Sequence, residues 1–283
     1  MTAAVSERAR GERRLGWMLS APAVLVMIAV TAYPLGRAVY LSLYSYRLTD
    51  AASREFIGLR NYSTVLTDSL WWTDVSTTVL ITVITVSVEL LIGFGFAMVM
   101  NKIIFGRRVV RTAILIPYGI ITVVSAFAWQ YAFSLDSGFV NSWFHLGDKA
   151  WFSDRWSAMF VICLSEIWKT TPFMSLLLLA GLAQVPEELQ EAAKIDGATW
   201  WQRLVKVTLP NMKAAIMVAV LFRTLDAFRI FDNVFIMTGG AQDTETVSFL
   251  AYRQTISRTA LGLGGAVSVL LFVCVVGIAA VFI

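Results

Sequence analysis

Six long apolar runs divide this chain of 283 residues, and they constrain its fold more than any other feature of the sequence. The runs lie at roughly 17–43, 75–100, 109–133, 157–182, 214–237 and 262–283. A helix of about 20 apolar residues crosses the hydrocarbon core of a bilayer, where every backbone polar group must be bonded internally. Because 58% of the residues are hydrophobic and only 15% are charged, we predict an all-α, polytopic membrane protein with six transmembrane helices in one transmembrane domain over 1–283.

The positive charges outside these runs are unevenly distributed. If the N-terminus lies inside, twelve Lys and Arg residues fall in the inner segments, before residue 15, around 102–111 and around 194–213, and seven fall in the outer segments. Short cytoplasmic segments carry such an excess, so we expect a multi-pass protein of the cytoplasmic membrane with a cytoplasmic N-terminus. The basic start is interpreted as an uncleaved anchor, because no small-residue cleavage site follows a short apolar core. The inside bias also explains the net charge of +4 without a nucleic-acid partner.

A polar loop at 183–213 separates the fourth and fifth runs and contains signals for two short helices. Pro186 has the fixed φ of a first helical position, and the two glutamates after it favour the positive end of the helix dipole. This first helix is expected to continue to Asp196 and to stop at Gly197, which readily adopts the left-handed conformation at a helix end. The loop is therefore suited to presenting a helix to a partner.

The second helix of the loop begins at a capping pattern. Thr199 and Gln202 form a Thr-x-x-Gln box, in which each side chain bonds the backbone N–H of the other residue. Because proline disrupts a helix interior, we expect this helix to end before Pro210. The alternative interpretation is an ordinary amphipathic loop that packs on the membrane face.

The fourth run carries polar side chains on one helical face, at i, i+3, i+4 and i+7: Glu166, Lys169, Thr170 and Phe173. Charged groups inside a membrane are costly and by default face a cavity or another helix. One interpretation is that Glu166 and Lys169 pair along the helix, which lowers the cost of burial. The other is a polar and aromatic wall for a sugar, in which charged groups bond hydroxyls and a ring stacks on the apolar sugar face. Both can hold together.

The fifth run contains four charged residues within ten positions: Arg223, Asp226, Arg229 and Asp232. One face of a helix here would present Leu225, Phe228, Arg229 and Asp232. Such a helix cannot face lipid, and opposite charges three residues apart can neutralise one another, so some of these charges are expected to be structural. Glu89 in the second run is a lone carboxylate, which we interpret as a helix-packing contact or a protonated acid rather than a ligand.

Motifs for chemistry within the chain are absent from its sequence. No Gly-x-x-x-x-Gly-Lys-Ser/Thr loop occurs, so the chain cannot hold ATP phosphates by the P-loop mechanism, and the energy source must be a partner. Cys163 and Cys274 form no metal or disulfide pattern. No nucleophile and base pair or metal cluster supports a membrane enzyme. We therefore expect a transport subunit, not an enzyme, with no cofactor of its own.

The loop at 183–213 resembles the cytoplasmic coupling loop of binding-protein-dependent ABC importer permeases. It carries that family's Glu-Ala-Ala, Asp-Gly-Ala and Leu-Pro elements in register, as Glu191-Ala192-Ala193, Asp196-Gly197-Ala198 and Leu209-Pro210. In the family, the short coupling helix docks into a groove of the ATPase subunit. The resemblance implies that the coupling residues are Glu191, Ala192, Ala193, Asp196, Gly197, Ala198, Leu204 and Pro210. Leu204 stands where sugar importers usually carry Phe, and Ala214 where a second Pro is common.

Other segments resemble the carbohydrate-uptake branch of that family, of the maltose type. They include Pro172-Phe173, Thr238-Gly239-Gly240 and Phe56-Ile57-Gly58-Leu59-Arg60-Asn61-Tyr62, and the strings at 167–174 and 226–233 are similar to the first permease subunit of mycobacterial-type trehalose importers. The resemblance implies a disaccharide substrate, trehalose, and a sugar site formed by Glu166, Lys169, Thr170, Phe173, Leu225, Phe228, Arg229 and Asp232. Maltose-type permeases often carry Asn or small residues where this chain has charges, which indicates a sugar other than maltose.

The charges of this site predict its form. Four residues are expected to line one cavity near the membrane midplane: Glu166, Lys169, Arg229 and Asp232. Each needs a partner or water in apolar surroundings, and two acids with two bases sum to zero, which suits a neutral disaccharide. The rings of Phe173 and Phe228 are expected to face the sugar.

The resemblance also implies a set of partners: a second homologous permease, two ATPase subunits that bind ATP and Mg²⁺, and an extracytoplasmic sugar-binding lipoprotein. The alternative from another class is an ion- or proton-coupled secondary transporter, in which Glu89, Glu166 and Asp232 would be relay groups. Inverted repeats and broken helices are typical of that class. The sequence shows no convincing internal repeat, and the coupling loop would be unexplained.

Overall fold

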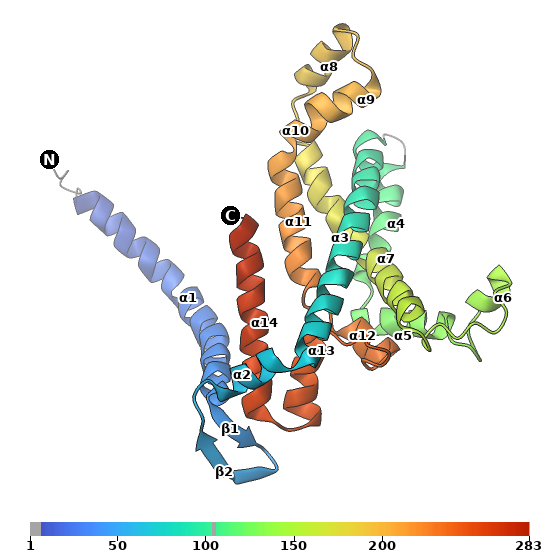
Figure 1. The fold of residues 1–283 in the computed structure, drawn as a ribbon. Helices are drawn as coiled ribbons and strands as arrows, with labels where there is room; N and C mark the ends of the chain where they lie inside the picture. Colours follow the sequence, from blue (N-terminus) through green and yellow to red (C-terminus); the bar gives the residue numbers. More distant parts are fainter. Residues whose placement is uncertain (1–6, 104–105, 283) are drawn as a thin grey trace. The chain divides into compact units, whose positions relative to one another are not determined.

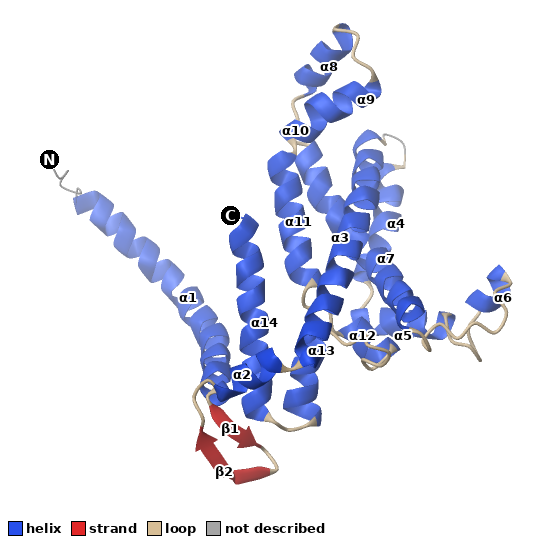
Figure 2. Ribbon diagram, viewed as in Figure 1, coloured by secondary structure: helices blue, strands red, loops and turns tan. Residues whose placement is uncertain are grey.

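The computed structural model describes residues 7–103 and 106–282, without the side chains of residues 7–10, 51–53 and 107. Arg8, Arg10 and Arg107, which are part of the expected inner charge, lie outside these described side chains. The described chain is mostly helical, with one small hairpin (Figure 2), which confirms the all-α class. It forms two compact units, Met1–Val65 with Arg253–Leu270, and Leu66–Tyr252 with Leu271–Ile283.

The first unit combines a long helix with a small hairpin. Its elements are α1 (Glu7–Ser42), β1 (Tyr44–Arg47), β2 (Asp50–Phe56), most of α2 (Arg60–Thr67), the π-helical turn η2 (Arg253–Ser257) and the start of α14 (Leu261–Phe282). Asn61 Nδ2 donates to the carbonyl oxygens of Ser42 (2.7 Å) and Tyr44 (2.9 Å), so α2 is tied to the junction of α1 and β1. A Cβ at position 262 would collide with the Tyr44 carbonyl oxygen, so Gly262 allows α14 to pack closely against this junction.

The second unit is a helical bundle. Its elements are α3 (Ser69–Lys102), α4 (Arg107–Gly119), α5 (Thr122–Ala132), α6 (Val140–Phe144), α7 (Arg155–Leu182), α8 (Glu187–Ile195), α9 (Trp200–Arg203), the π-helical turn η1 (Leu204–Thr208), α10 (Leu209–Asn211), α11 (Lys213–Ala227), α12 (Asp232–Met237) and α13 (Val247–Tyr252). α3 and α7 pack along each other, with α11 against both (Figure 1). Asp68 and Asp154 cap the first turns of α3 and α7.

Two of the six expected spans are broken. Within the described residues, four helices are long and apolar enough to cross a membrane: Gly11–Ser42, Ser69–Lys102, Arg155–Leu182 and Leu261–Phe282. The run at 109–133 instead forms α4 and α5, which meet at a bend of 88°. The run at 214–237 forms α11, of 15 residues, and the short α12. The expected count of six transmembrane helices is therefore not confirmed: the described residues contain four, or five if α4 and α5 form one bent span. Hydropathy reports apolar length but not where tertiary contacts replace the helical hydrogen bonds.

The loop at 183–213 largely follows its sequence signals. α8 begins at Glu187, directly after Pro186, and Gly197 adopts the left-handed conformation with φ of 76°. The capping box is confirmed: Thr199 N donates to Gln202 Oε1 (2.8 Å), and Gln202 N donates to Thr199 Oγ1 (3.3 Å). The expected end of the second helix before Pro210 is wrong. The chain continues through η1 into α10, where Pro210 lies in the first turn and its missing N–H is not needed.

Candidate functional site

A cavity of about 450 Å³ lies where α7 passes the two helix breaks of the second unit. The α4–α5 break contributes Tyr118 and Thr122, α7 contributes Glu166, Lys169 and Thr170, and the α11–α12 break contributes Asp226, Arg229, Ile230, Phe231, Asp232 and Asn233. Most of these side chains carry a charge or a hydroxyl, amide or aromatic group. The cavity is therefore suited to a polar ligand with several hydrogen-bonding groups.

Side chains replace the hydrogen bonds that the broken helices lose. Lys169 Nζ donates to the carbonyl oxygen of Ile120, at the α4–α5 break, over 2.8 Å. Thr246 Oγ1 donates to the carbonyl oxygen of Ile230, at the α11–α12 break, over 3.1 Å. An unsatisfied backbone group in an apolar interior costs several kcal/mol. These two bonds therefore stabilise non-helical backbone beside the cavity.

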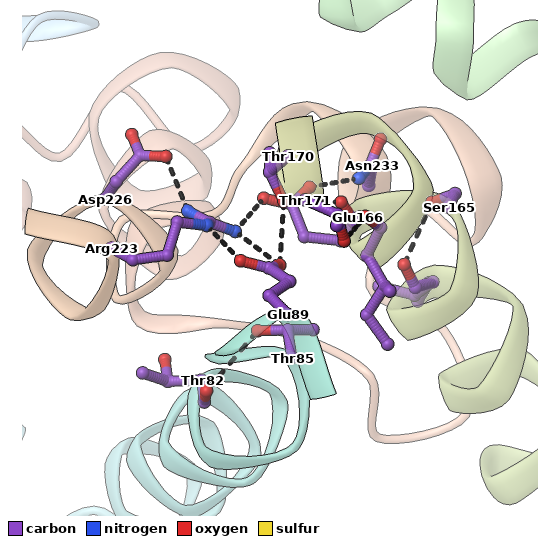
Figure 3. A network of polar contacts seen from close by, with 12 residues as sticks. Thr82, Thr85, Glu89, Ser165, Glu166, Thr170, Thr171, Arg223, Asp226 and Asn233 are labelled. Atoms are coloured by element: carbon purple, nitrogen blue, oxygen red, sulfur yellow. Dashed lines mark hydrogen bonds and ion pairs between the residues drawn. The ribbon is translucent and has the colours of Figure 1, made fainter. Parts of the chain in front are cut away.

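A buried ionic cluster lies against the cavity, and its centre is Arg223 (Figure 3). Arg223 Nε and Nη2 contact Glu89 Oε2 and Oε1 at 2.5 Å and 3.0 Å, and Nη2 also donates to Glu166 Oε1 at 2.9 Å. Nη1 contacts Asp226 Oδ2 at 2.6 Å. The side chains of Arg223 and Glu89 are fully buried, whereas that of Asp226 is 60% exposed. The cluster thus joins α3, α7 and α11 through charged hydrogen bonds.

Neutral polar groups complete this cluster. Asn233 Nδ2 donates to Glu166 Oε2 at 2.7 Å, so the second oxygen of this carboxylate also has a donor. The Thr170 hydroxyl lies 2.7 Å from Glu89 Oε1 and 2.6 Å from the carbonyl oxygen of Glu166. α12 is thereby added to the three helices joined by Arg223, and every carboxylate oxygen of Glu89 and Glu166 is bonded.

The structure places most, but not all, of the expected sugar-site residues at the cavity. Five of them line it: Glu166, Lys169, Thr170, Arg229 and Asp232. The other three, Phe173, Leu225 and Phe228, are not among the lining residues. Phe173 stacks on Tyr118 with ring centroids 5.4 Å apart, and Phe228 is only 5% exposed. The ring that faces the cavity from α4 is thus that of Tyr118.

Two interpretations of single charges are corrected by the structure. Glu166 and Lys169 do not bond each other along α7, because Glu166 bonds Arg223 of α11 and Lys169 bonds Ile120 at the α4–α5 break. Glu89 is not a lone carboxylate, because Arg223 reaches it from 134 positions further along the chain. Its role as a helix-packing contact is therefore confirmed. Local spacing predicted neither bond, since tertiary partners compete with neighbours on the same helix.

Six residues that line the cavity were not among the expected sugar-site residues: Tyr118, Thr122, Asp226, Ile230, Phe231 and Asn233. Arg223, which lies behind Glu166, was not among them either. The Pro117-Tyr118-Gly119 string within an apolar run was a signal for a break, since both Pro and Gly interrupt helices. Arg223 was visible as a charge within the fifth run. The spacing of three residues indicated its contact with Asp226, which is confirmed, but no local signal indicated its partners on other helices, Glu89 and Glu166.

The expected coupling residues lie mostly at the surface of the loop. α8 has no buried residue, and Glu191, Ala192, Asp196 and Gly197 are exposed. Figure 1 shows α8 and α9 beyond the ends of α7 and α11. Leu204 is buried, with 9% exposed, and lines a second cavity of about 640 Å³ below the loop. Gln190 Nε2 donates to Thr208 Oγ1 at 2.9 Å, which ties α8 to η1.

Comparisons with known proteins agree with this architecture. Residues 89–283 match the family described as "Binding-protein-dependent transport system inner membrane component". The trehalose transport system permease protein SugA of Mycobacterium tuberculosis is 50% identical over 96% of this chain and 88% of that protein. The trehalose/maltose transport system permease protein MalF of Thermococcus litoralis is 36% identical over 96% of this chain and 93% of that protein.

A solved structure shows the same fold. A chain of the bacterial alginate ABC transporter, in complex with its alginate pentasaccharide-bound periplasmic protein, superposes with a TM-score of 0.82 at 20% identity, covering 98% of this chain and 96% of that one. Such an identity shows the fold alone, whereas the family match covers more than half of the sequence. The chain therefore belongs to the inner-membrane components of binding-protein-dependent transport systems, the permease subunits of ABC importers, and is not an enzyme.

Proposed function

We propose that this chain forms half of the translocation pathway of an ATP-driven ABC importer for a disaccharide, trehalose. The observation that carries the proposal is a polar cavity at two helix breaks, in a chain 50% identical to a trehalose permease. Broken helices are also typical of secondary transporters. The family assignment favours the ABC importer over that alternative.

The charges around the cavity support an uncharged ligand. Glu166, Asp226 and Asp232 contribute three negative charges, and Lys169 and Arg229 contribute two positive charges. Arg223, directly behind Glu166, adds one positive charge, and Glu89, which is bonded to Arg223, adds one negative charge. Four acids thus face three bases, and the buried charges of Glu89, Glu166 and Arg223 are bonded to one another, so a neutral disaccharide can enter without bringing a charge that needs a partner. Carboxylates and ammonium groups then bond its hydroxyls, and the ring of Tyr118 offers an apolar face.

The loop at 183–213 supports coupling to an external motor. Its exposed α8 is suited to docking into a groove of an ATPase subunit, which would hold the ATP and Mg²⁺. We propose a complex with two such ATPase subunits, a second homologous permease and an extracytoplasmic sugar-binding lipoprotein. In this complex the loop and the N-terminus are cytoplasmic, as the positive-inside rule indicates.

α11 offers a route for that coupling. It begins at Lys213, the last residue of the loop, and ends at Ala227, next to residues that line the cavity. A helix transmits a displacement along its axis because its hydrogen bonds resist stretching. Closure of the ATPase dimer on ATP would therefore move the loop, α11 and the cavity wall together, and alternate access to the bound sugar.

Uptake by the complete importer in proteoliposomes tests this function. Labelled trehalose and the sugar-binding protein are supplied outside, and ATP inside. We expect uptake that requires ATP and does not change when an ionophore collapses the proton gradient. Uptake that disappears with the gradient, at constant ATP, would instead support a secondary transporter, and competition by other disaccharides would identify a different sugar.

A further inference from the structure

We propose that Arg223 is the positioning residue of the sugar site: its guanidinium sets the direction of the Glu166 carboxylate, and thereby determines which sugar hydroxyl is recognised. This inference rests on the proposed function and extends it to a residue that does not line the cavity. Arg223 is fully buried and lies behind Glu166. It therefore acts on a ligand only through its neighbours.

Glu89 holds Arg223 in place. The guanidinium is bound through two nitrogens, Nε and Nη2, to the two oxygens of Glu89. Such bidentate contacts fix the plane of a guanidinium as well as its position. Both side chains are fully buried, so water does not compete for these bonds. The orientation of Arg223 is thus determined by a residue of α3 that does not line the cavity.

Arg223 in turn directs Glu166. Nη2 donates to Glu166 Oε1, and Asn233 donates to Oε2, so each oxygen has a fixed donor. A carboxylate can accept about four hydrogen bonds. Two acceptor positions therefore remain for the hydroxyls of a ligand in the cavity that Glu166 lines. Their direction depends on the two donors already bound.

A simpler role for Arg223 is to neutralise Glu89 and nothing more. Asp226 does not distinguish the two roles, because its exposed side chain contributes a solvent-screened contact. The roles differ when both charges are removed together. Neutralisation alone predicts that Glu89→Gln with Arg223→Gln restores normal transport. A positioning role predicts that this double variant still loses hydroxyl selectivity, because Glu166 has lost a fixed donor.

The test measures selectivity within each variant. The complete importer is reconstituted in proteoliposomes with one wild-type binding protein throughout. Initial uptake rates are compared for trehalose and for symmetric analogues that lack the same hydroxyl on both glucose units, since a symmetric sugar could otherwise present its intact half. For one analogue, wild-type uptake should be at least about tenfold slower, as expected for a hydroxyl bonded to a charged acceptor.

In the Glu89→Gln/Arg223→Gln variant this preference should fall to within about twofold, whereas Arg223→Lys, a single point donor, should retain part of it. Thr85→Val is the matched control, because Thr85 is buried on the same helix one turn from Glu89 and its hydroxyl bonds, among the described residues, only the carbonyl oxygen of Thr82. The control should keep the wild-type preference.

A double variant that transports with the wild-type preference overturns the proposal. The proposal is also overturned if neither Arg223→Lys nor the double variant assembles into the importer while Thr85→Val does. Arg223 would then be a packing residue. A wild-type complex that takes up no trehalose overturns the proposed substrate instead. The role of Arg223 is then decided by comparing uptake of the sugar that the complex does transport with uptake of analogues of that sugar that lack one hydroxyl.

Discussion

Arg223 is the side chain on which the polar contacts beside the cavity converge. It contacts carboxylates of two other helices, Glu89 and Glu166, and Asp226 of its own helix. Moving a charge out of water costs several kcal/mol unless partners compensate for it. Because Arg223 and Glu89 are both fully buried, neither is tolerated without the other. The cluster therefore behaves as one unit in any substitution.

Replacing Glu89 with leucine is expected to lower the free energy of unfolding by about 3 kcal/mol, because a buried guanidinium would lose its bidentate acceptor. Thermal unfolding of the permease in detergent measures this loss. Glu89→Leu combined with Arg223→Met should recover only part of it, because apolar side chains can replace the Glu89–Arg223 pair but leave the buried Glu166 without its guanidinium partner. Thr85→Val, which removes one hydrogen bond, should cost only about 1 kcal/mol. An unchanged unfolding temperature in Glu89→Leu would contradict the argument.

Two broken elements, together with the continuous helix α7, form the walls of the cavity. Each break exposes backbone that a single residue satisfies, Lys169 for Ile120 and Thr246 for Ile230. The loop contains a third discontinuity, at Gly197, where φ of 76° separates α8 from α9. A residue with a branched Cβ cannot take this conformation without strain. The direction of α8 therefore depends on the side chain at one position.

Changing Gly197 to valine is expected to cost about 1–2 kcal/mol in the local conformation and to turn α8 away from its docking orientation. Sugar-stimulated ATP hydrolysis by the complete importer should fall. Gly197→Asn is the matched control, because asparagine tolerates left-handed backbone, and it should retain most of the stimulation. Equal stimulation in the valine and asparagine variants would show that the hinge does not control coupling.

Across the second unit, α11 connects the coupling loop with the cavity. Its 15 residues run from Lys213 to Ala227, and Gln190 ties α8 to the turn before it. Arg223 lies on the last turns of this helix, so the ionic cluster and the loop share one rigid element. The stiffness of α11 should then determine how much sugar moves for each ATP.

Softening α11 away from both of its ends tests this connection. Val218 is 47% exposed, so its replacement removes little packing. Val218→Gly should leave the helix about 1 kcal/mol weaker than Val218→Ala and lower the number of sugars transported per ATP by up to about fivefold. Val218→Ala removes the same branched side chain but keeps a strong helix former, and should leave that ratio unchanged. A ratio that falls equally in both variants would point to lost side-chain contacts instead.

Local signals in the sequence were sufficient for several features of this protein. The apolar runs were sufficient to predict an all-α membrane protein, because a transmembrane helix requires only about twenty consecutive apolar residues. Gly197, Thr199 and Gln202 determined the hinge and the cap of the loop, since their hydrogen bonds and backbone conformation involve neighbours three positions apart. The Glu-Ala-Ala and Asp-Gly-Ala elements indicated the family for the same reason: their spacing lies within one segment.

Only the tertiary structure decided the partners of the buried charges and the breaks in two spans. Glu166 bonds Arg223, 57 positions away, in preference to Lys169 on its own helix. Lys169 bonds Ile120, 49 positions away, and so stabilises a break that hydropathy could not reveal. The physical reason is that a buried charge bonds the partner that best compensates for the free energy lost when the charge leaves water. That choice depends on which helices pack together, and no periodicity along a single helix records it.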